Sequence, residues 1–349
     1  MGSSKSVLIG GTLFGGGAPV RVESMLKTRL EDASGCIEEV QALAKEGCEL
    51  VRIAFPAAEL GKDLSQVVRE SPIPIMGDIH FNHKLAIAAL EAGVASVRIN
   101  PGNMGSQAGL LEVLAAAKDH NAVIRIGANG GSVSRSQMES ANGDSAMALV
   151  LAVEEQLAVL LDHGFDNLLL SAKSSSVPQT IRANAILSQK YPFPLHIGIT
   201  EAGPGVLGAV KSAAGIGILL AQGIGDTLRV SLSSPSVEEV RVGYGILRSL
   251  ELRKRGINLI SCPGCGRRRV DVQQLVEQIL PLLPPLPDGF TVAIMGCEVN
   301  GPQEAAGADL GIAGTAGGVV LFHKGKPIAT TTADQLEAVL KQSLAELLQ

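Results

Sequence analysis

Short runs of β-branched and aliphatic residues alternate with longer, alanine- and leucine-rich amphipathic stretches over the first 250 residues. Eight of these runs are expected to be strands: 19–25, 49–55, 72–80, 96–101, 123–129, 167–173, 194–202 and 227–233. The intervening helices are expected to include 36–46, 82–92, 106–119, 143–163, 178–189, 206–221 and 236–250. Strands alternating with helices predict parallel βαβ units, and eight units in about 250 residues match a closed (β/α)8 TIM barrel. An open doubly wound sheet is the alternative, because periodicity does not report closure.

The pattern changes after residue 250. A charged segment leads into a short strand and a cysteine-containing turn, SCPGCG (261–266), and then into an expected helix at 271–282. A strand in FTVAIMG (290–296), a hairpin turning at Lys324-Gly325 and a closing helix at 334–348 complete this part. We therefore expect a barrel domain over 1–250, a hinge at 251–258 and a smaller α+β domain over 259–349.

Composition narrows the class of protein. The net charge is −5, aromatic residues make up 3% and tryptophan is absent. Nucleic-acid binding, which favours a basic face with stacking aromatics, is therefore not expected. Five cysteines, an odd number, argue against a disulfide scaffold and for a reducing compartment. Without a recognisable signal or membrane span, the chain is expected to be soluble and cytoplasmic, with no membrane partner.

Polar side chains gather at the expected carboxyl ends of the strands, where a barrel of this kind places its chemistry. Charge inside strands that are buried on both faces is costly unless it is paired or bound to a ligand. The arginines outnumber the carboxylates that this pattern offers, Asp78 and Glu201, which favours a polyanionic ligand, a diphosphate, over a purely structural ion network. The candidate residues are Arg52, Asp78, His80, Arg98, Asn100, Arg125, Asn129, Lys173, Glu201, Arg229 and Ser231.

Two weaker motifs have other interpretations. GPGVLG (203–208) fits G-x-G-x-x-G, but it lies in the seventh unit, so a phosphate cradle at a helix N-terminus is favoured over a dinucleotide site. His80 and His83 could form a metal pair. We instead expect His80 to face the mouth of the barrel and His83 to begin the next helix.

Three cysteines near the end of the chain suggest a metal centre. Cys262, Cys265 and Cys297, followed by Glu304, have the spacing C-x2-C-x31-C-x6-E. Three thiolates indicate zinc or an iron–sulfur cluster, while a redox dithiol lacks its usual sequence context. Glu304 is the nearest strong fourth ligand, and as a hard oxygen donor it would make one iron of a cluster different from the others. Cys36 and Cys48 have apolar neighbours and are expected to be inert.

Several motifs occur in the order of one known family. DIHF, RINPGN, ITEAG, GIGDTLRVSL, RGINLISCPGC and GCEVNGP resemble the 4-hydroxy-3-methylbut-2-enyl diphosphate synthases of the methylerythritol phosphate route to isoprenoids. The resemblance covers nearly the whole chain and implies a TIM barrel with a [4Fe–4S] domain. One departure is Gln303, which stands where the family has a glycine.

The resemblance also implies a reaction and roles. The reaction is the two-electron reductive ring opening and dehydration of 2-C-methyl-D-erythritol 2,4-cyclodiphosphate. A separate ferredoxin or flavodoxin would supply the electrons, and the enzyme would be a homodimer. Glu201 would be the acid/base carboxylate, with His80 next in line. Cys262, Cys265, Cys297 and Glu304 would hold the cluster, and the remaining strand-end residues would bind the substrate.

Two other functions are compatible with the residues alone. One is a non-redox barrel enzyme that handles a phosphate ester or a pterin and carries a structural zinc domain. The other is a non-catalytic iron–sulfur carrier, which would leave the arginine-lined mouth without a purpose.

Overall fold

A computed structural model describes residues 2–80, 82–100, 106–299, 305 and 307–347 of the chain. The chain divides into two compact units, Met1–Arg253 and Lys254–Gln349. No helix in the described part of the chain is both long and apolar enough to span a bilayer.

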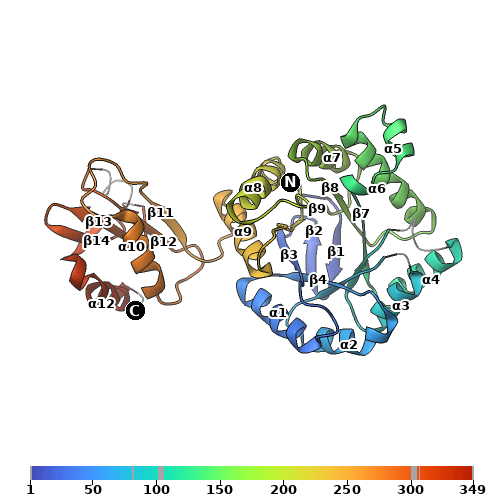
Figure 1. Cartoon of the computed structure of the whole chain (residues 1–349), viewed down its shortest axis with the longest axis horizontal. Helices are drawn as coiled ribbons and strands as arrows, with labels where there is room; N and C mark the ends of the chain where they lie inside the picture. Colours follow the sequence, from blue (N-terminus) through green and yellow to red (C-terminus); the bar gives the residue numbers. More distant parts are fainter. Residues whose placement is uncertain (1, 81, 101–105, 300–304, 306, 348–349) are drawn as a thin grey trace. The chain divides into compact units, whose positions relative to one another are not determined.

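The first unit contains a parallel eight-stranded sheet, ordered β8-β7-β6-β5-β4-β3-β10-β9. A parallel bridge between Leu170 and Leu195 joins its two ends, and the N–H of Leu170 donates to the carbonyl of Pro194 at 2.9 Å. The sheet therefore closes, which confirms the (β/α)8 barrel (Figure 1). Its strands are β3 (Arg21–Met25), β4 (Leu50–Ala54), β5 (Ile75–Asp78), β6 (Ser96–Arg98), β7 (Val123–Asn129), β8 (Leu168–Lys173), β9 (His196–Ile197) and β10 (Thr227–Leu228).

Helices surround the barrel (Figure 1). Several begin at a polar residue whose side chain accepts a hydrogen bond from a free N–H of the first turn; Asp32, for example, caps α1 through the N–H of Gly35. Two helices, α2 and α5, were not expected from the sequence pattern; both are short, and α5 buries no side chain. The helices are α1 (Ala33–Glu46), α2 (Gly61–Glu70), α3 (His83–Glu91), α4 (Gln107–Asp119), α5 (Arg135–Ser140), α6 (Ser145–Asp162), α7 (Val177–Lys190), α8 (Gly205–Ala221) and α9 (Ser236–Ser249).

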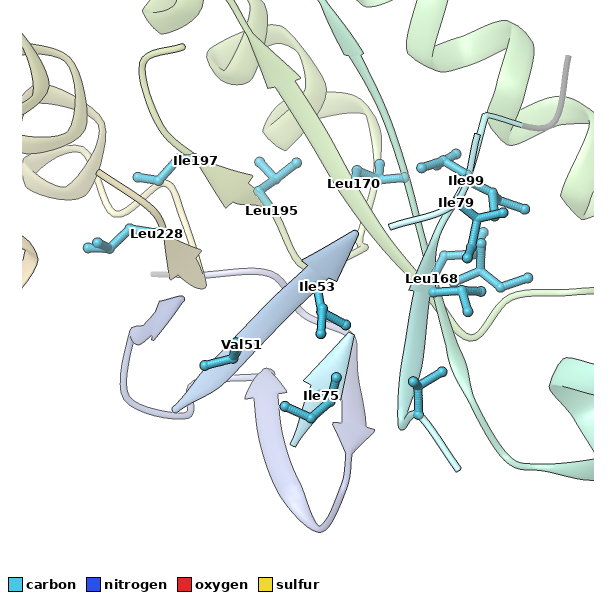
Figure 2. Close-up of a cluster of buried hydrophobic side chains, with 14 of the residues drawn as sticks. Val51, Ile53, Ile75, Ile79, Ile99, Leu168, Leu170, Leu195, Ile197 and Leu228 are labelled. Atoms are coloured by element: carbon cyan, nitrogen blue, oxygen red, sulfur yellow. The ribbon is translucent and has the colours of Figure 1, made fainter. Parts of the chain in front are cut away.

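Alternation along the strands separates an apolar exterior from the barrel interior, which is polar at the carboxyl ends of the strands. On β4, Val51 and Ile53 belong to the large hydrophobic cluster that packs against the helices, as do Leu168 and Leu170 on β8 (Figure 2). Successive side chains of a strand point to opposite faces, so the residues between them face the barrel interior. The apolar residues that pack against the helices therefore determine which of the alternating strand residues point into the barrel.

A hairpin not expected from the sequence closes one end of the barrel interior. It consists of β1 (Ser6–Ile9) and β2 (Thr12–Gly15). Its buried side chains Val7, Ile9 and Phe14 form a cluster with inward-facing residues near the beginnings of the barrel strands, Leu50, Met76, Val123 and Leu169. This apolar layer leaves the carboxyl ends of the strands as the polar end of the interior.

The second unit is a five-stranded mixed sheet in the order β11-β12-β13-β14-β15. Its first three strands are parallel, and the last three are antiparallel neighbours. Apolar residues of the two helices in the described part of this unit pack on one face of the sheet. The β14–β15 hairpin turns at Lys324-Gly325 as expected, while β13 was not expected. The elements are β11 (Asn258–Ser261), α10 (Val272–Ile279), β12 (Thr291–Met295), β13 (Leu310–Thr315), β14 (Gly318–His323), β15 (Lys326–Thr331) and α12 (Leu336–Leu347).

Candidate active site

A cavity opens at the carboxyl ends of the barrel strands. Its empty volume, including the space at its open mouth, is about 430 Å³. Most of its lining is polar and comes from inward positions of the strands or from the residues just after them. The lining residues are Arg52, Arg98, Arg125, Ile126, Gly127, Asn129, Ser171, Lys173, Thr200, Arg229 and Ser231. Seven of these are candidates that the sequence placed at strand ends: Arg52, Arg98, Arg125, Asn129, Lys173, Arg229 and Ser231.

Asp78 is the centre of a first group of charges beside the cavity. Its carboxylate lies 3.8 Å from Nε of Arg52, 3.4 Å from Nη1 of Arg98 and 3.6 Å from Nε2 of His80. Burial would raise the pKa of Asp78, but the hydrogen bond from His80 and the charges of Arg52 and Arg98 lower this pKa well below its usual range. Asp78 is therefore ionised and orients two arginines at the rim.

Glu23 is the centre of a second, fully buried group. Nη1 of Arg125 donates to both oxygens of the Glu23 carboxylate at 2.7 Å. Nδ1 of His196 lies 3.4 Å from Oε2 of Glu23, and Nε2 of His196 lies 2.7 Å from Nζ of Lys173. Burial would raise the pKa of Glu23, but the nearby cations, Arg125 first, lower it. Burial lowers the pKa of Arg125 to about 10 in spite of this partner.

Arg229 belongs to a third group, which includes a methionine. Its guanidinium lies 3.3 Å from the carboxylate of Glu239, a residue of α9 that also lies 3.3 Å from Nζ of Lys27. The sulfur of Met25 accepts hydrogen bonds from Arg52 at 2.9 Å and from Arg229 at 3.6 Å. A thioether is a weak and uncharged acceptor. Met25 thus holds two guanidinium groups near each other without neutralising either of them.

The expected set of carboxylates at the mouth, Asp78 and Glu201, is incomplete. Asp78 contacts Arg52 and Arg98, but Glu23 and Glu239 also pair with Arg125 and Arg229. Glu23 was detectable in principle, because it alternates with Val22 and Ser24 in the first strand and so faces inward. Glu239 was not, because it lies on a helix and reaches the mouth only in the folded chain. Four arginines and Lys173 line the cavity, and among the described residues three carboxylates contact the arginines, Glu23, Asp78 and Glu239, so a smaller surplus of positive charge remains.

The remaining candidates lie at the edge of this constellation. Glu201 is exposed in the turn after β9 and has a left-handed backbone, with φ of 53°. Such a conformation costs free energy for a residue other than glycine and is a pointer to function. His80 is exposed and lies 3.2 Å from Nη1 of Arg98. Asn100 follows β6 and is half-buried. Neither Glu201 nor His80 lines the cavity.

Three cysteines lie in the second unit. Cys262 directly follows β11, and Cys297 lies two residues after β12, its parallel neighbour, so both are at the same edge of the sheet. The N–H of Gly264 points to the sulfur of Cys262 at 3.3 Å. Cys262 is half-buried, Cys265 exposed and Cys297 buried. Within the described ranges, no group of three His, Cys, Asp or Glu side chains is arranged to hold a metal ion, and Glu304 lies outside those ranges.

The other two cysteines differ from these three. Cys36 and Cys48 are buried in the barrel unit. Burial raises the pKa of Cys36 to about 11 and that of Cys48 to about 12. A thiol with such a pKa is protonated and unreactive at neutral pH.

The fold and the site define a class: a TIM-barrel protein with an arginine-lined mouth and a cysteine-bearing α+β unit. Residues 4–244 match the GcpE TIM-barrel domain, and residues 258–346 match the GcpE protein C-terminal domain. The chain belongs to the GcpE family. The family resemblance inferred from the motifs is thereby confirmed.

Curated relatives match over almost their whole length. A protein of Maridesulfovibrio salexigens is 46% identical over 95% of this chain and 93% of its own. One of Geobacter sulfurreducens is 44% identical over 98% of both chains. Each is named 4-hydroxy-3-methylbut-2-en-1-yl diphosphate synthase (flavodoxin). Among solved structures, a Plasmodium falciparum HPPK-DHPS aligns with a TM-score of 0.50 and 12% identity over 71% of this chain and 49% of its own, a likeness of fold alone.

Proposed function

We propose that this chain is a reductive synthase that opens and dehydrates 2-C-methyl-D-erythritol 2,4-cyclodiphosphate to (E)-4-hydroxy-3-methylbut-2-enyl diphosphate. The observation that carries the proposal is the cavity into which five cationic residues converge at the carboxyl ends of the barrel strands. The names of the relatives support the oxidoreductase activity and flavodoxin as the electron donor. The family supports this function and not the zinc-containing, non-redox alternative.

In this proposal the mouth binds the diphosphate. Arg52 and Arg229 would act together, because both donate to the sulfur of Met25, which holds the two guanidinium groups near each other. Bidentate guanidinium groups fit phosphate oxygens. The remaining substrate-binding residues would be Asp78, His80, Arg98, Asn100, Arg125, Asn129, Lys173 and Ser231.

Glu201 would deliver the proton that the departing oxygen requires. It lies on the turn after β9, next to Thr200 of the cavity lining, and its strained backbone fits a functional role. Because this carboxyl is exposed, water can return a proton to it between turnovers. His80 is the second candidate, because it contacts Asp78 and Arg98 at the rim.

The residues of the second unit fit a [4Fe–4S] cluster in part. Cys262 and Cys297 lie at one edge of the sheet, and the N–H directed at Cys262 matches a thiolate better than a thiol. Cys262, Cys265 and Cys297 would be ligands, with Glu304 proposed as the fourth from its spacing alone. When bound, the cluster supplies electrons singly to the substrate. The protein's part is to hold three thiolates and exclude competing ligands.

Metal analysis and absorption spectroscopy distinguish this proposal from the zinc alternative. Anaerobically purified protein should be brown, with a broad band near 400 nm and about four irons per chain. Glu304→Ala should lose iron on exposure to air, whereas Glu304→Cys should keep it but turn over slowly, since thiolate is a tighter ligand than carboxylate. A colourless protein with one zinc per chain would contradict the proposal.

Assembly and location follow from the resemblance. The chain would act as a cytoplasmic homodimer in which the cluster unit of one copy serves the barrel of the other. Mixing inactive Glu201→Gln chains with inactive Cys297→Ser chains tests this arrangement. Mixed dimers should regain activity, and mixed dimers that form without regaining any would exclude a shared site.

A further inference from the structure

A column of three titratable side chains extends from the cavity into the barrel. Nζ of Lys173 lies 2.7 Å from Nε2 of His196, whose Nδ1 lies 3.4 Å from Oε2 of Glu23. Only 7% of Lys173, 0% of His196 and 1% of Glu23 is exposed. Lys173 is the member of the column that lines the cavity. An anion in the cavity would therefore meet the column at this amine.

The charges facing Lys173 are mostly positive. Arg125, Arg52 and Arg229 all act on it as cations, and Glu23 is the carboxylate that opposes them. Both oxygens of Glu23 already accept hydrogen bonds from Arg125. The carboxylate of Asp78 is held at the rim by Arg98 and His80, and that of Glu239 contacts Arg229. Without an anion, the amine lies in a positive field with little compensation.

Burial and this field determine the protonation of the column. Burial and the charge of Arg125 lower the pKa of Lys173 well below its usual value. Burial and the neighbouring cations lower the pKa of His196 as well. The carboxylate of Glu23 favours the His196 tautomer with its proton on Nδ1, which leaves Nε2 to accept a hydrogen bond from Lys173. His196 thereby positions the amine at the wall of the cavity, and the charge of Glu23, 3.4 Å from Nδ1, acts on the imidazole from the other side.

We propose that binding of a dianion at the barrel mouth is coupled to the uptake of one proton by the amine of Lys173, which His196 positions. The proton comes from solvent and converts the amine to an ammonium, which donates to the anion and to Nε2 of His196. A dianion offsets the positive field at the amine, and an opposite charge within about 4–6 Å favours the charged form. The identity of the anion rests on the proposed function; the coupling does not.

The sign of the pH dependence follows from linkage. Below the pKa that Lys173 has in the free protein, the amine is already charged and affinity does not change with pH. Above that pKa each binding event must capture a proton. Affinity should therefore weaken as pH rises, by about tenfold per unit, until the pKa of the complex is reached.

Titration calorimetry in buffers of different ionisation enthalpy measures the coupling directly. Two probes would be used, the cyclodiphosphate and inorganic sulfate. Neither titrates near neutral pH, because each phosphorus of the cyclic diphosphate has a single strongly acidic oxygen. Wild-type protein should take up about one proton per anion, and Lys173→Met should take up none. Lys190→Met, the same substitution at a lysine on the outer surface paired with Glu154, should behave as wild type.

Variants of His196 test positioning separately from folding. His196→Leu should weaken anion binding about tenfold, the order of one lost hydrogen bond to a charged group, and retain the proton uptake. His196→Gln should restore most of the affinity, because its amide oxygen can accept from the ammonium. If His196 served only to maintain the fold, its replacement would not change the anion affinity while leaving the number of protons taken up unchanged.

The outcomes separate this proposal from the proposed function. If sulfate binds with one proton but the cyclodiphosphate does not bind, the substrate assignment fails and the coupling is supported. Wild-type protein that binds either anion without taking up a proton overturns the coupling. Continued uptake of one proton by Lys173→Met would also overturn it.

Discussion

At the mouth of the barrel, charged side chains on strands β3 to β7 contact one another directly, whereas the cysteines of the second unit are only brought to one edge of a sheet. Glu23 and Arg125 form a fully buried pair at 2.7 Å. Cys265, in contrast, is exposed, and within the described residues no metal-binding group is assembled. The mouth is organised by its own ion pairs. In the proposed function, binding of the cluster would bring the cysteines together, because metal binding and local folding are often coupled.

The largest expected effect is a loss of turnover caused by a change in the second unit that leaves substrate binding by the barrel unit intact. Cys297→Ser should lose the cluster absorption near 400 nm and all measurable turnover, while calorimetry should find the cyclodiphosphate affinity of the barrel unchanged. Cys36→Ser is the control, because Cys36 is a buried thiol of the barrel unit that lies 3.4 Å from the carbonyl of Arg29. That variant should keep its colour and its activity. Turnover in Cys297→Ser would remove the cysteines from the mechanism.

The next effect tests whether ion pairs organise the mouth. Glu23→Leu leaves Arg125 as an unpaired buried cation and should lower the free energy of unfolding by about 3–5 kcal/mol, measured in urea. Sulfate should recover part of this loss by supplying a counter-charge. The matched control, Arg241→Leu, breaks the exposed pair with Glu46 and should cost less than about 1 kcal/mol. Equal losses in the two variants would contradict the comparison.

A smaller effect concerns proton delivery. Glu201→Gln retains the size of the side chain but cannot donate a proton, so turnover should fall about 10²-fold. The cluster absorption and the cyclodiphosphate affinity should not change. Near-normal turnover would transfer the role to His80, for which His80→Gln would be the corresponding variant.

The smallest effect tests the contribution of one guanidinium group to anion binding at the mouth. Arg229→Ala should weaken cyclodiphosphate binding by about 2 kcal/mol, because it removes one guanidinium and leaves Glu239 facing the anion. Calorimetry measures the affinity, and the absorption spectrum should be that of the wild type. Affinity equal to the wild type would exclude Arg229 from the anion site.

The fold was predictable from the sequence where hydrophobic periodicity was strong. All eight barrel strands and their order along the chain followed from buried runs, because both faces of these strands are covered. The hairpin β1–β2 was missed, since its role in closing the barrel depends on contacts with Leu50 and Val123 that are distant in sequence. Strand β13 was missed for a different reason: its glycine and alanine residues weaken the hydrophobic pattern.

The site was predictable only where residues lie at strand ends. Arg52, Arg125 and Lys173 were found because they follow apolar runs at inward positions. His196 and Glu239 were not found. The first is enclosed within a short strand, and the second belongs to a helix, so neither has a sequence signal that distinguishes it from an ordinary structural residue. Their roles depend on tertiary distances to Lys173 and Arg229.

In the proposed function, the arginine-lined mouth and the cysteine unit together carry out a reductive ring opening. The most direct measurement is turnover of 2-C-methyl-D-erythritol 2,4-cyclodiphosphate by anaerobically reconstituted protein, with an artificial one-electron reductant and product analysis by mass spectrometry. The account predicts (E)-4-hydroxy-3-methylbut-2-enyl diphosphate, formed with two electrons consumed per molecule. Absence of this product from protein that contains the cluster and binds the cyclodiphosphate would contradict the account.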